Sequence, residues 1–149
     1  GEITFCGAIE MGGWIDLHVD LIKDGCNKYD ITQAMFQPGP VEPRYSEFLV
    51  FEGISLNDDG SQSYIDVTMA YRRACLNAIN YLQKFGYSGE QVYTILSTAP
   101  VEGRVSGVVD IPNACVSLYI PTAIFDFDIR PNAAGPTKKV TGGDLARAS

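Results

Sequence analysis

The hydrophobic period of the chain changes at Met69, and this change sets the strongest limit on how the chain can fold. Between Met69 and Phe85, apolar residues recur at intervals of three and four, which predicts an amphipathic helix. Its expected buried stripe comprises Tyr71, Cys75, Ala78, Leu82 and Phe85. Asp66 or Thr68 is suited to cap the start of this helix, and Gly86 its end.

A second helix should follow at once. Ser88-Gly-Glu-Gln91 has the form of a capping box, in which the serine and glutamine side chains bond each other's backbone N–H groups. It predicts a helix over about residues 89–98, which Pro100 stops.

Upstream of these helices, apolar and polar residues alternate, which is typical of half-buried strands. Residues 1–10 form the first predicted strand, and one face of it carries Glu2, Thr4, Cys6, Ala8 and Glu10. Met11-Gly12-Gly13 is a turn signal, so residues 15–21 should pair with this strand as a β-hairpin. Residues 27–41 look irregular because they contain Pro38-Gly39-Pro40.

A second hairpin is predicted from residues 47–56 and 63–67, around a turn in which Gly60 can supply a positive φ. Residues 104–110 and 114–120 return to β character, and residues 123–128 have no assignable type. These elements together indicate an α+β fold of mainly antiparallel β hairpins, or a sandwich, with an inserted pair of α-helices.

Composition excludes several classes of protein. The 149 residues are 46% hydrophobic and 19% charged, which suits one modest domain with its own core. A formal net charge of -7 with no basic stripe argues against a nucleic-acid partner, and no apolar run is long enough to span a membrane. The four cysteines form no C-x-x-C pair, so we expect reduced thiols and a cytoplasmic protein. Residues 130–149 have little to bury and predict a flexible C-terminal tail.

Three groups of side chains are candidates for chemistry. Cys6 is placed as a nucleophile, but Glu2 and Glu10 on the same face would raise its pKa, and His18 is the only histidine that could pair with it. Asp16 and Asp20 flank that histidine with ligand types that zinc accepts. However, same-face residues of a strand lie roughly 6.5 to 7 Å apart, so a solvated face is the simpler interpretation.

The third group is a pair of acid-x-base motifs. Glu42 and Arg44 lie on a proline-stiffened loop that would hold two charges at fixed geometry, and Glu102 and Arg104 repeat the spacing. Each pair is either functional or a simple salt bridge.

Five blocks of sequence, in one order over nearly the whole chain, resemble the acetamidase/formamidase family. They are Glu2-Ile-Thr-Phe-Cys-Gly-Ala-Ile-Glu10, Pro38-Gly-Pro-Val-Glu-Pro-Arg-Tyr-Ser-Glu47, Ala70-Tyr-Arg-Arg-Ala-Cys-Leu-Asn-Ala78, Phe85-Gly-Tyr-Ser-Gly-Glu90 and Val109-Asp-Ile-Pro-Asn-Ala-Cys115. The resemblance implies that residues 1–129 are the C-terminal portion of a longer family domain, with residues 130–149 as its tail. It also implies that Gly1 and Glu2 close a Gly-Asp-Gly-Glu motif that begins upstream.

The same resemblance implies a metal-dependent amide hydrolase that converts formamide, or a similarly short aliphatic amide, to a carboxylate and ammonia. Glu2 would be a ligand of a divalent metal, expected to be zinc, with the other ligands upstream of Gly1. Glu2, Glu10 and Glu42 are the candidate catalytic residues. The expected partners are the small amide substrate, the upstream portion of the same protein and further copies in a homo-oligomer.

Two alternatives stay open on the sequence. Acetamide or a cyclic amide such as a γ-lactam would suit the same family, because a pocket discriminates one methylene by only about 1 to 3 kcal/mol. A chain without most of its metal ligands could also be a non-catalytic, β-rich module for assembly or binding.

Overall fold

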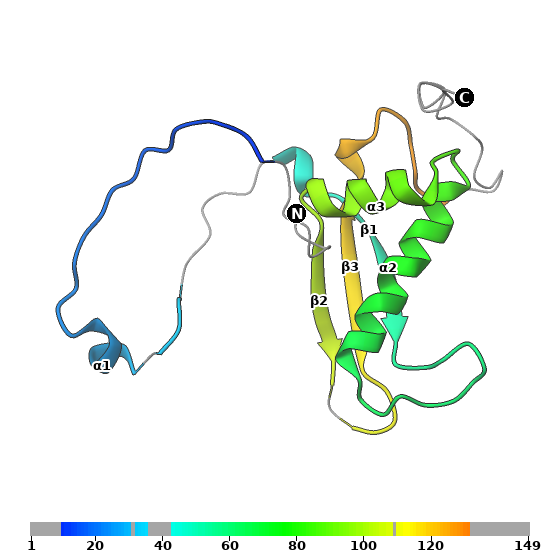
Figure 1. Cartoon of the computed structure of the whole chain (residues 1–149), viewed down its shortest axis with the longest axis horizontal. Coiled ribbons are helices and arrows are strands. Elements are labelled where there is room, and N and C mark those ends of the chain that lie inside the picture. The colour runs from blue at the N-terminus through cyan, green and yellow to red at the C-terminus, as the bar shows by residue number, and fades with distance from the viewer. Residues whose placement is uncertain (1–9, 31, 36–42, 109, 132–149) are drawn as a thin grey trace.

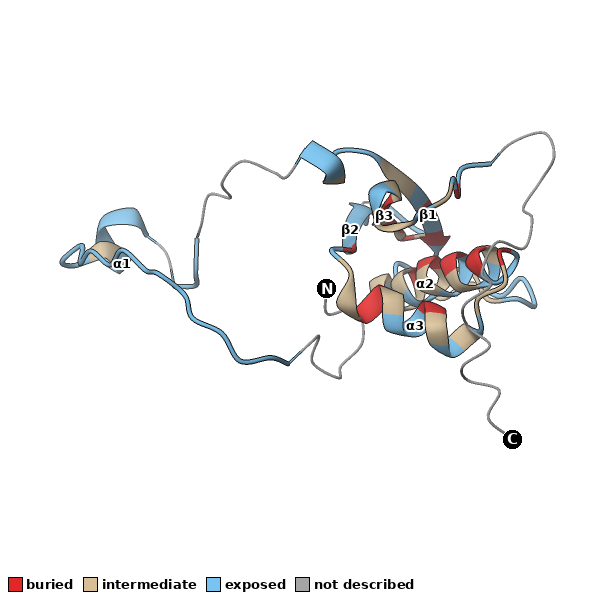
Figure 2. Cartoon of the chain, turned by 90° about the horizontal axis from the view of Figure 1, so that it is seen from above, coloured by how far each residue is buried: buried red, intermediate tan, exposed pale blue. Residues whose placement is uncertain are grey.

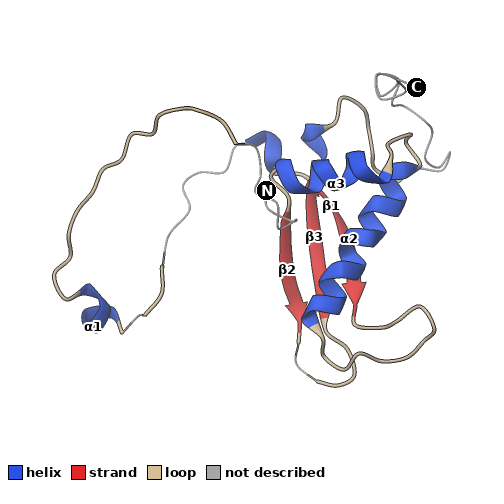
Figure 3. Cartoon of the chain, in the orientation of Figure 1, coloured by secondary structure: helices blue, strands red, loops and turns tan. Residues whose placement is uncertain are grey.

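A computed structural model of the chain describes residues 10–30, 32–35, 43–108 and 110–131 (Figure 1). A three-stranded sheet and two helices form its body, while residues 10–30 lie away from that body and contain the short helix α1 (Gly25–Tyr29). Figure 3 shows the helices and strands of the body. The α+β class predicted from the sequence is confirmed.

Both predicted helices are present, and their N-terminal caps are those expected, whereas the C-cap of the first helix is Lys84 and not the predicted Gly86. Helix α2 (Val67–Gln83) begins after Asp66, whose side chain accepts a hydrogen bond from the Met69 N–H at 2.9 Å. Helix α3 (Gly89–Thr98) begins with a complete capping box: the Gln91 N–H donates to Ser88 Oγ, and the Ser88 N–H donates to Gln91 Oε1. These local bonds satisfy backbone N–H groups that a helix start leaves unpaired.

The sheet has the strand order β1-β3-β2, and all of its pairs are antiparallel. Its strands are β1 (Phe48–Ile54), β2 (Glu102–Gly107) and β3 (Cys115–Pro121). The central strand β3 therefore pairs with β1 on one side and with β2 on the other. Its register with β1 places Glu52 opposite Ser117. Between Val105 and Gly107 the register of β2 shifts by one residue.

The core lies between one face of the sheet and helices α2 and α3. Figure 2 shows buried residues on the sides of α2 and of the strands that face each other. Helix α2 presents mostly small residues to the sheet, so the two backbones approach closely. The buried apolar residues of α2 and of the facing strands are Ala70, Ala74, Ala78, Leu82, Phe51, Val116, Leu118 and Ile120.

Two predicted strands are wrong. Residues 15–21 form no strand and pair with no described strand, and their apolar side chains are exposed. Alternation marks a face that needs covering, but the described part of the chain supplies nothing to cover this one. The predicted opening strand, residues 1–9, lies outside the described residues.

Residues 63–67 likewise form no strand, although Gly60 has the expected positive φ of 82°. Only a single bridge, between Leu56 and Gln62, remains of the predicted hairpin. The reason is that the chain at Ile65 takes a φ of 47° and Asp66 then caps the start of α2, so the extended course ends before a second strand can form.

The remaining predictions concern the segment without an assignable type, the C-terminal tail and the absence of a membrane-spanning helix. Short 3-10 helices occur at η1 (Pro43–Tyr45) and at η2 (Thr122–Ile124), the latter overlapping the segment without an assignable type. The predicted tail lies almost wholly outside the described residues, so the boundary at 129/130 stays a prediction. Across the described ranges, no helix is long and apolar enough to cross a membrane.

Candidate functional site

The structure does not bring the three predicted catalytic glutamates together. Glu2 and Glu42 lie outside the described residues, as does Cys6. Glu10 begins the described segment 10–30 and is exposed. Their roles therefore stay predictions.

The Asp16-His18-Asp20 motif is solvated, as the simpler interpretation expected. His18 Nε2 lies 3.0 Å from Asp20 Oδ2, and the two side chains are 89% and 80% exposed. Within the described ranges, no group of three or more His, Cys, Asp or Glu side chains is arranged to hold a metal ion.

The two acid-x-base motifs differ in what the structure describes of them. Arg104 Nη2 lies 2.8 Å from Glu102 Oε2, and its guanidinium carbon lies 4.2 Å from the centroid of the Tyr119 ring. This exposed ion pair and cation–π contact indicate a structural role on β2. Arg44 stacks on Tyr45 at 4.8 Å, and its predicted partner Glu42 is not described.

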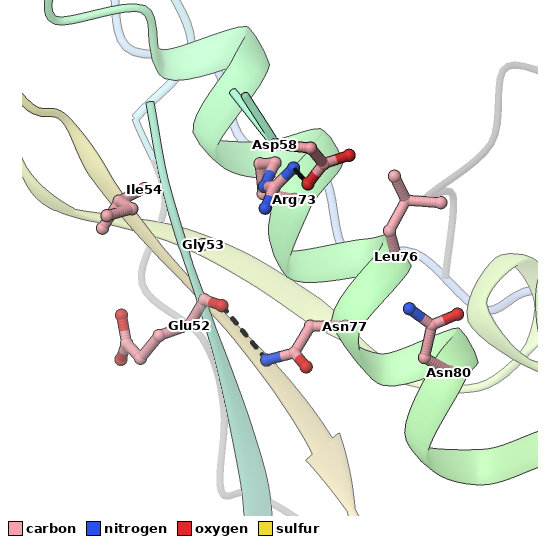
Figure 4. A pocket seen from close by; sticks show the side chains of 8 residues that line it. All are labelled: Glu52, Gly53, Ile54, Asp58, Arg73, Leu76, Asn77 and Asn80. Atoms are coloured by element: carbon pink, nitrogen blue, oxygen red, sulfur yellow. Dashed lines mark hydrogen bonds and ion pairs between the residues drawn. The ribbon is translucent and has the colours of Figure 1, made fainter. Parts of the chain in front are cut away.

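A polar cluster that sequence reasoning missed lies on the open face of the sheet, opposite the helices. Glu52 alternates with the buried residues Phe51 and Gly53, so its side chain points away from α2 (Figure 4). Glu52 Oε2 accepts a hydrogen bond from Cys115 Sγ at 2.8 Å, and its Oε1 accepts one from Ser117 Oγ at 2.7 Å. Ser106 Oγ of β2 bonds Ser117 Oγ in turn. We call Glu52, Ser106, Cys115 and Ser117 the Glu52 cluster.

Hydrogen bonds within this cluster shift the pKa values of Glu52 and Cys115 in opposite directions. The Cys115 thiol and the Ser117 hydroxyl both donate to the Glu52 carboxylate, which lowers the pKa of Glu52. The same bond raises the pKa of the Cys115 thiol, because the neighbouring carboxylate disfavours a thiolate. Cys115 is therefore a protonated donor at neutral pH and not an activated nucleophile. Burial similarly raises the pKa of Cys75 to about 11.

A pocket of about 370 Å³ lies beside this cluster, between β1 and α2 (Figure 4). Its wall is partly polar: Asn77 Nδ2 donates to the backbone oxygen of Glu52 at 3.4 Å, and Arg73 forms an ion pair with Asp58. The lining residues are Glu52, Gly53, Ile54, Asp58, Arg73, Leu76, Asn77 and Asn80. A second pocket, of about 430 Å³, lies at η2 and is lined by Glu47, Thr122, Ala123, Phe125, Asp126, Phe127, Asp128 and Arg130.

The chemistry available in the described residues is thus that of a fixed, ionised carboxylate. It can accept an N–H or attract a cation, but it lacks the ligands to hold a metal by itself. Sequence spacing could not find the cluster, because Glu52 is 63 residues from Cys115 and 65 from Ser117. Only the register of β1 against β3 brings them together.

Comparison with known proteins extends the resemblance seen in the sequence. A model of the Acetamidase/Formamidase family matches residues 1–127. A formamidase of Methylophilus methylotrophus is 64% identical over 143 residues, which are 96% of this chain and 35% of that protein. An acetamidase of Mycolicibacterium smegmatis is 62% identical over 105 residues, covering 69% of this chain and 26% of that protein.

A solved structure gives the same result. The gamma lactamase from Delftia acidovorans is 61% identical, with a TM-score of 0.86, over 93% of this chain and 34% of that one. The chain thus spans about a third of the length of these longer relatives.

Proposed function

Because the chain belongs to the acetamidase/formamidase family, we propose that it is part of an amide hydrolase that acts on formamide. The reaction adds water across the amide C–N bond and gives formate and ammonia. The observation that carries this proposal is the family match over residues 1–127, together with 64% identity to a protein named formamidase.

Acetamide and γ-lactams are the second candidate substrates. They are favoured by the 62% identity to an acetamidase and the 61% identity to a gamma lactamase. All three substrates share the amide bond and differ in size, so the same hydrolytic chemistry would serve each of them.

We further propose that the reaction uses a divalent metal, zinc, with Glu2 among its ligands. The described residues do not themselves form such a site, so the remaining ligands would come from segments like those that precede this region in the longer relatives. A bound zinc ion lowers the pKa of its water from about 15.7 to about 7 and so supplies hydroxide at neutral pH.

Glu10 and Glu42 are proposed to act beside Glu2. A carboxyl group that protonates the leaving amine needs a raised pKa, which burial provides. Glu10 is exposed in this structure, so this role requires that another part of the protein cover it. Glu10 would alternatively orient the attacking water, and Glu42, which lies outside the described residues, is the third proposed catalytic carboxylate.

The whole protein is proposed to be a cytoplasmic homo-oligomer. A non-catalytic module for assembly is the rival hypothesis, and the exposed apolar side chains of residues 15–21 favour it. Under that hypothesis, the chain contributes surface to a larger enzyme and no catalytic group.

A substrate panel tests the proposal. Protein made from its full coding sequence would be incubated with formamide, acetamide and a γ-lactam, with ammonia measured for the linear amides and the ring-opened amino acid for the lactam. We expect formamide to give the highest kcat/KM. If only the lactam is hydrolysed, the second class of candidate substrates is the correct one. If folded protein hydrolyses none of the three, the result favours the hypothesis of a non-catalytic assembly module.

A further inference from the structure

The pocket of about 370 Å³ between β1 and α2 has both a polar and an apolar wall, and all of its lining residues belong to this chain (Figure 4). Arg73, Asn77 and Asn80 line it from α2, at spacings of four and three that place them on one face of the helix. Leu76 of α2 and Ile54 of β1 supply apolar surface, and they are 42% and 40% exposed. Pockets of this size that combine apolar surface with a few polar groups are typical binding sites for small molecules.

Arg73 is the one positively charged residue among those that line the pocket. It forms its ion pair with Asp58 through Nη1, and its Nε and Nη2 hydrogens have no partner among the described residues. A guanidinium carries five N–H donors in a planar fork that matches the geometry of a carboxylate. Arg73 therefore has donors left for a carboxylate in addition to that of Asp58.

The carboxylates around the pocket leave room for such a ligand. Asp58 comes from the turn after β1, and its side chain is 91% exposed, so water screens its ion pair and the pair is weak. The Glu52 side chain points away from the pocket, where Cys115 and Ser117 bind it (Figure 4). Asp58 thus shows that Arg73 is placed to bind a carboxylate, and it competes only weakly with a second one.

We propose that this pocket binds a short-chain aliphatic carboxylate. The carboxylate would accept hydrogen bonds from Arg73 and from the amide group of Asn80, and the alkyl chain would lie against Leu76 and Ile54. Hydrolysis of a short aliphatic amide releases an acid of this class, so the assignment of the ligand as a reaction product rests on the proposed function. The binding itself depends only on the pocket.

A binding titration on protein made from its full coding sequence tests this inference. Butyrate is titrated and its bound fraction is measured from the line width of its NMR signals, which needs no turnover. We expect saturable binding to the wild type, and Arg73→Gln should weaken it about tenfold, because charge-assisted hydrogen bonds are the strong ones. Normal butanol keeps the alkyl chain without the carboxylate, so it should not displace butyrate.

Two further variants make the result specific to the pocket. Arg72→Gln removes the neighbouring charge on α2 from an exposed side chain that does not line the pocket, so it should leave the affinity unchanged. Asp58→Asn removes the competing carboxylate and should tighten binding about threefold, in keeping with a weak exposed ion pair. This gain does not depend on whether Arg73→Gln folds, which circular dichroism checks.

The inference is overturned if the wild type does not bind butyrate at tens of millimolar, as when another segment fills the pocket. It is also overturned if Arg72→Gln weakens binding as much as Arg73→Gln, or if Asp58→Asn does not tighten it. Ammonia release from formamide is measured on the same samples. Binding through Arg73 without any amide hydrolysis would support the pocket and contradict the proposed function, whereas hydrolysis without this binding would contradict the pocket alone.

Discussion

At the scale of single residues, Glu52 links the two strands that sequence reasoning did not pair. It is a carboxylate on β1 with two hydrogen-bond donors on β3, from Cys115 and Ser117. The donors hold the carboxylate in its ionised form, and this preference makes the stability of the fold depend on pH.

We predict that Glu52→Gln lowers the free energy of unfolding by no more than about 1 kcal/mol at neutral pH, because it replaces a charged acceptor with a neutral one at an exposed position where water screens the charge. The folded-state pKa of Glu52 is depressed below its ordinary value of 4.5. Its contribution is therefore present above that value and is lost as the pH falls through the folded-state pKa. Urea unfolding at neutral and acidic pH should show that the difference between wild type and variant shrinks in acid.

The control for this prediction is Glu102→Gln on the neighbouring strand. Its carboxylate forms an exposed ion pair with Arg104, so removing the charge should cost no more than about 0.5 kcal/mol. A difference for Glu52→Gln that stays constant with pH would contradict the assignment.

The same cluster predicts slow alkylation of Cys115. Its thiol pKa is raised by Glu52, so at mildly alkaline pH iodoacetamide should modify Cys115 more slowly than the exposed Cys26. Glu52→Gln removes the neighbouring charge and should accelerate the reaction at Cys115. Cys75, whose pKa is raised by burial, should stay slow in both proteins. Peptide mass spectrometry measures each rate, and equal rates at Cys26 and Cys115 in the wild type would count against the account.

At the scale of elements, the contact between β1 and α2 depends on Gly53. A Cβ built at Gly53 would lie 2.1 Å from the backbone oxygen of Ala70 and 2.3 Å from the nitrogen of Ala74. Both atoms belong to the helix backbone, which cannot rotate aside as a side chain could. The glycine therefore sets how closely the helix packs on the sheet.

We predict that Gly53→Ala destabilises the protein by about 3 kcal/mol or more, at or above the upper end of ordinary overpacking costs. The matched control is Gly107→Ala on β2, where a Cβ meets nothing within 4 Å and the change should stay within about 0.5 kcal/mol. Denaturant unfolding measures both. A small effect at Gly53 would show that α2 shifts on the sheet at little cost.

The elements also show which parts of the fold were predictable. The two helices followed from local signals, the three-to-four period and the Ser88–Gln91 capping box, because a helix is bonded within itself. Strands 15–21 and 63–67 were wrong because alternation reveals a face but not the partner strand. The pairing of β1 with β3, and with it the Glu52 cluster, depends on packing between distant segments.

At the scale of the whole molecule, the chain corresponds to about a third of the length of its longer relatives. It contributes a helix-backed sheet, a pocket beside Glu52 and the exposed apolar side chains of residues 15–21. Its proposed metal ligand Glu2 lies outside the described residues. The catalytic account therefore depends on Glu2 and on the metal more than on any group in the described body.

Release of ammonia from formamide, with and without the metal, tests that account most directly. Protein made from its full coding sequence should release ammonia and formate in equal amounts, lose activity with a chelator and regain it with zinc. Glu2→Gln should lower kcat/KM by roughly 100-fold or more, since even residues that only support a metal ligand are worth about 10–100-fold. Glu102→Gln should leave the rate unchanged. Full activity in the chelated protein and in Glu2→Gln would contradict the account.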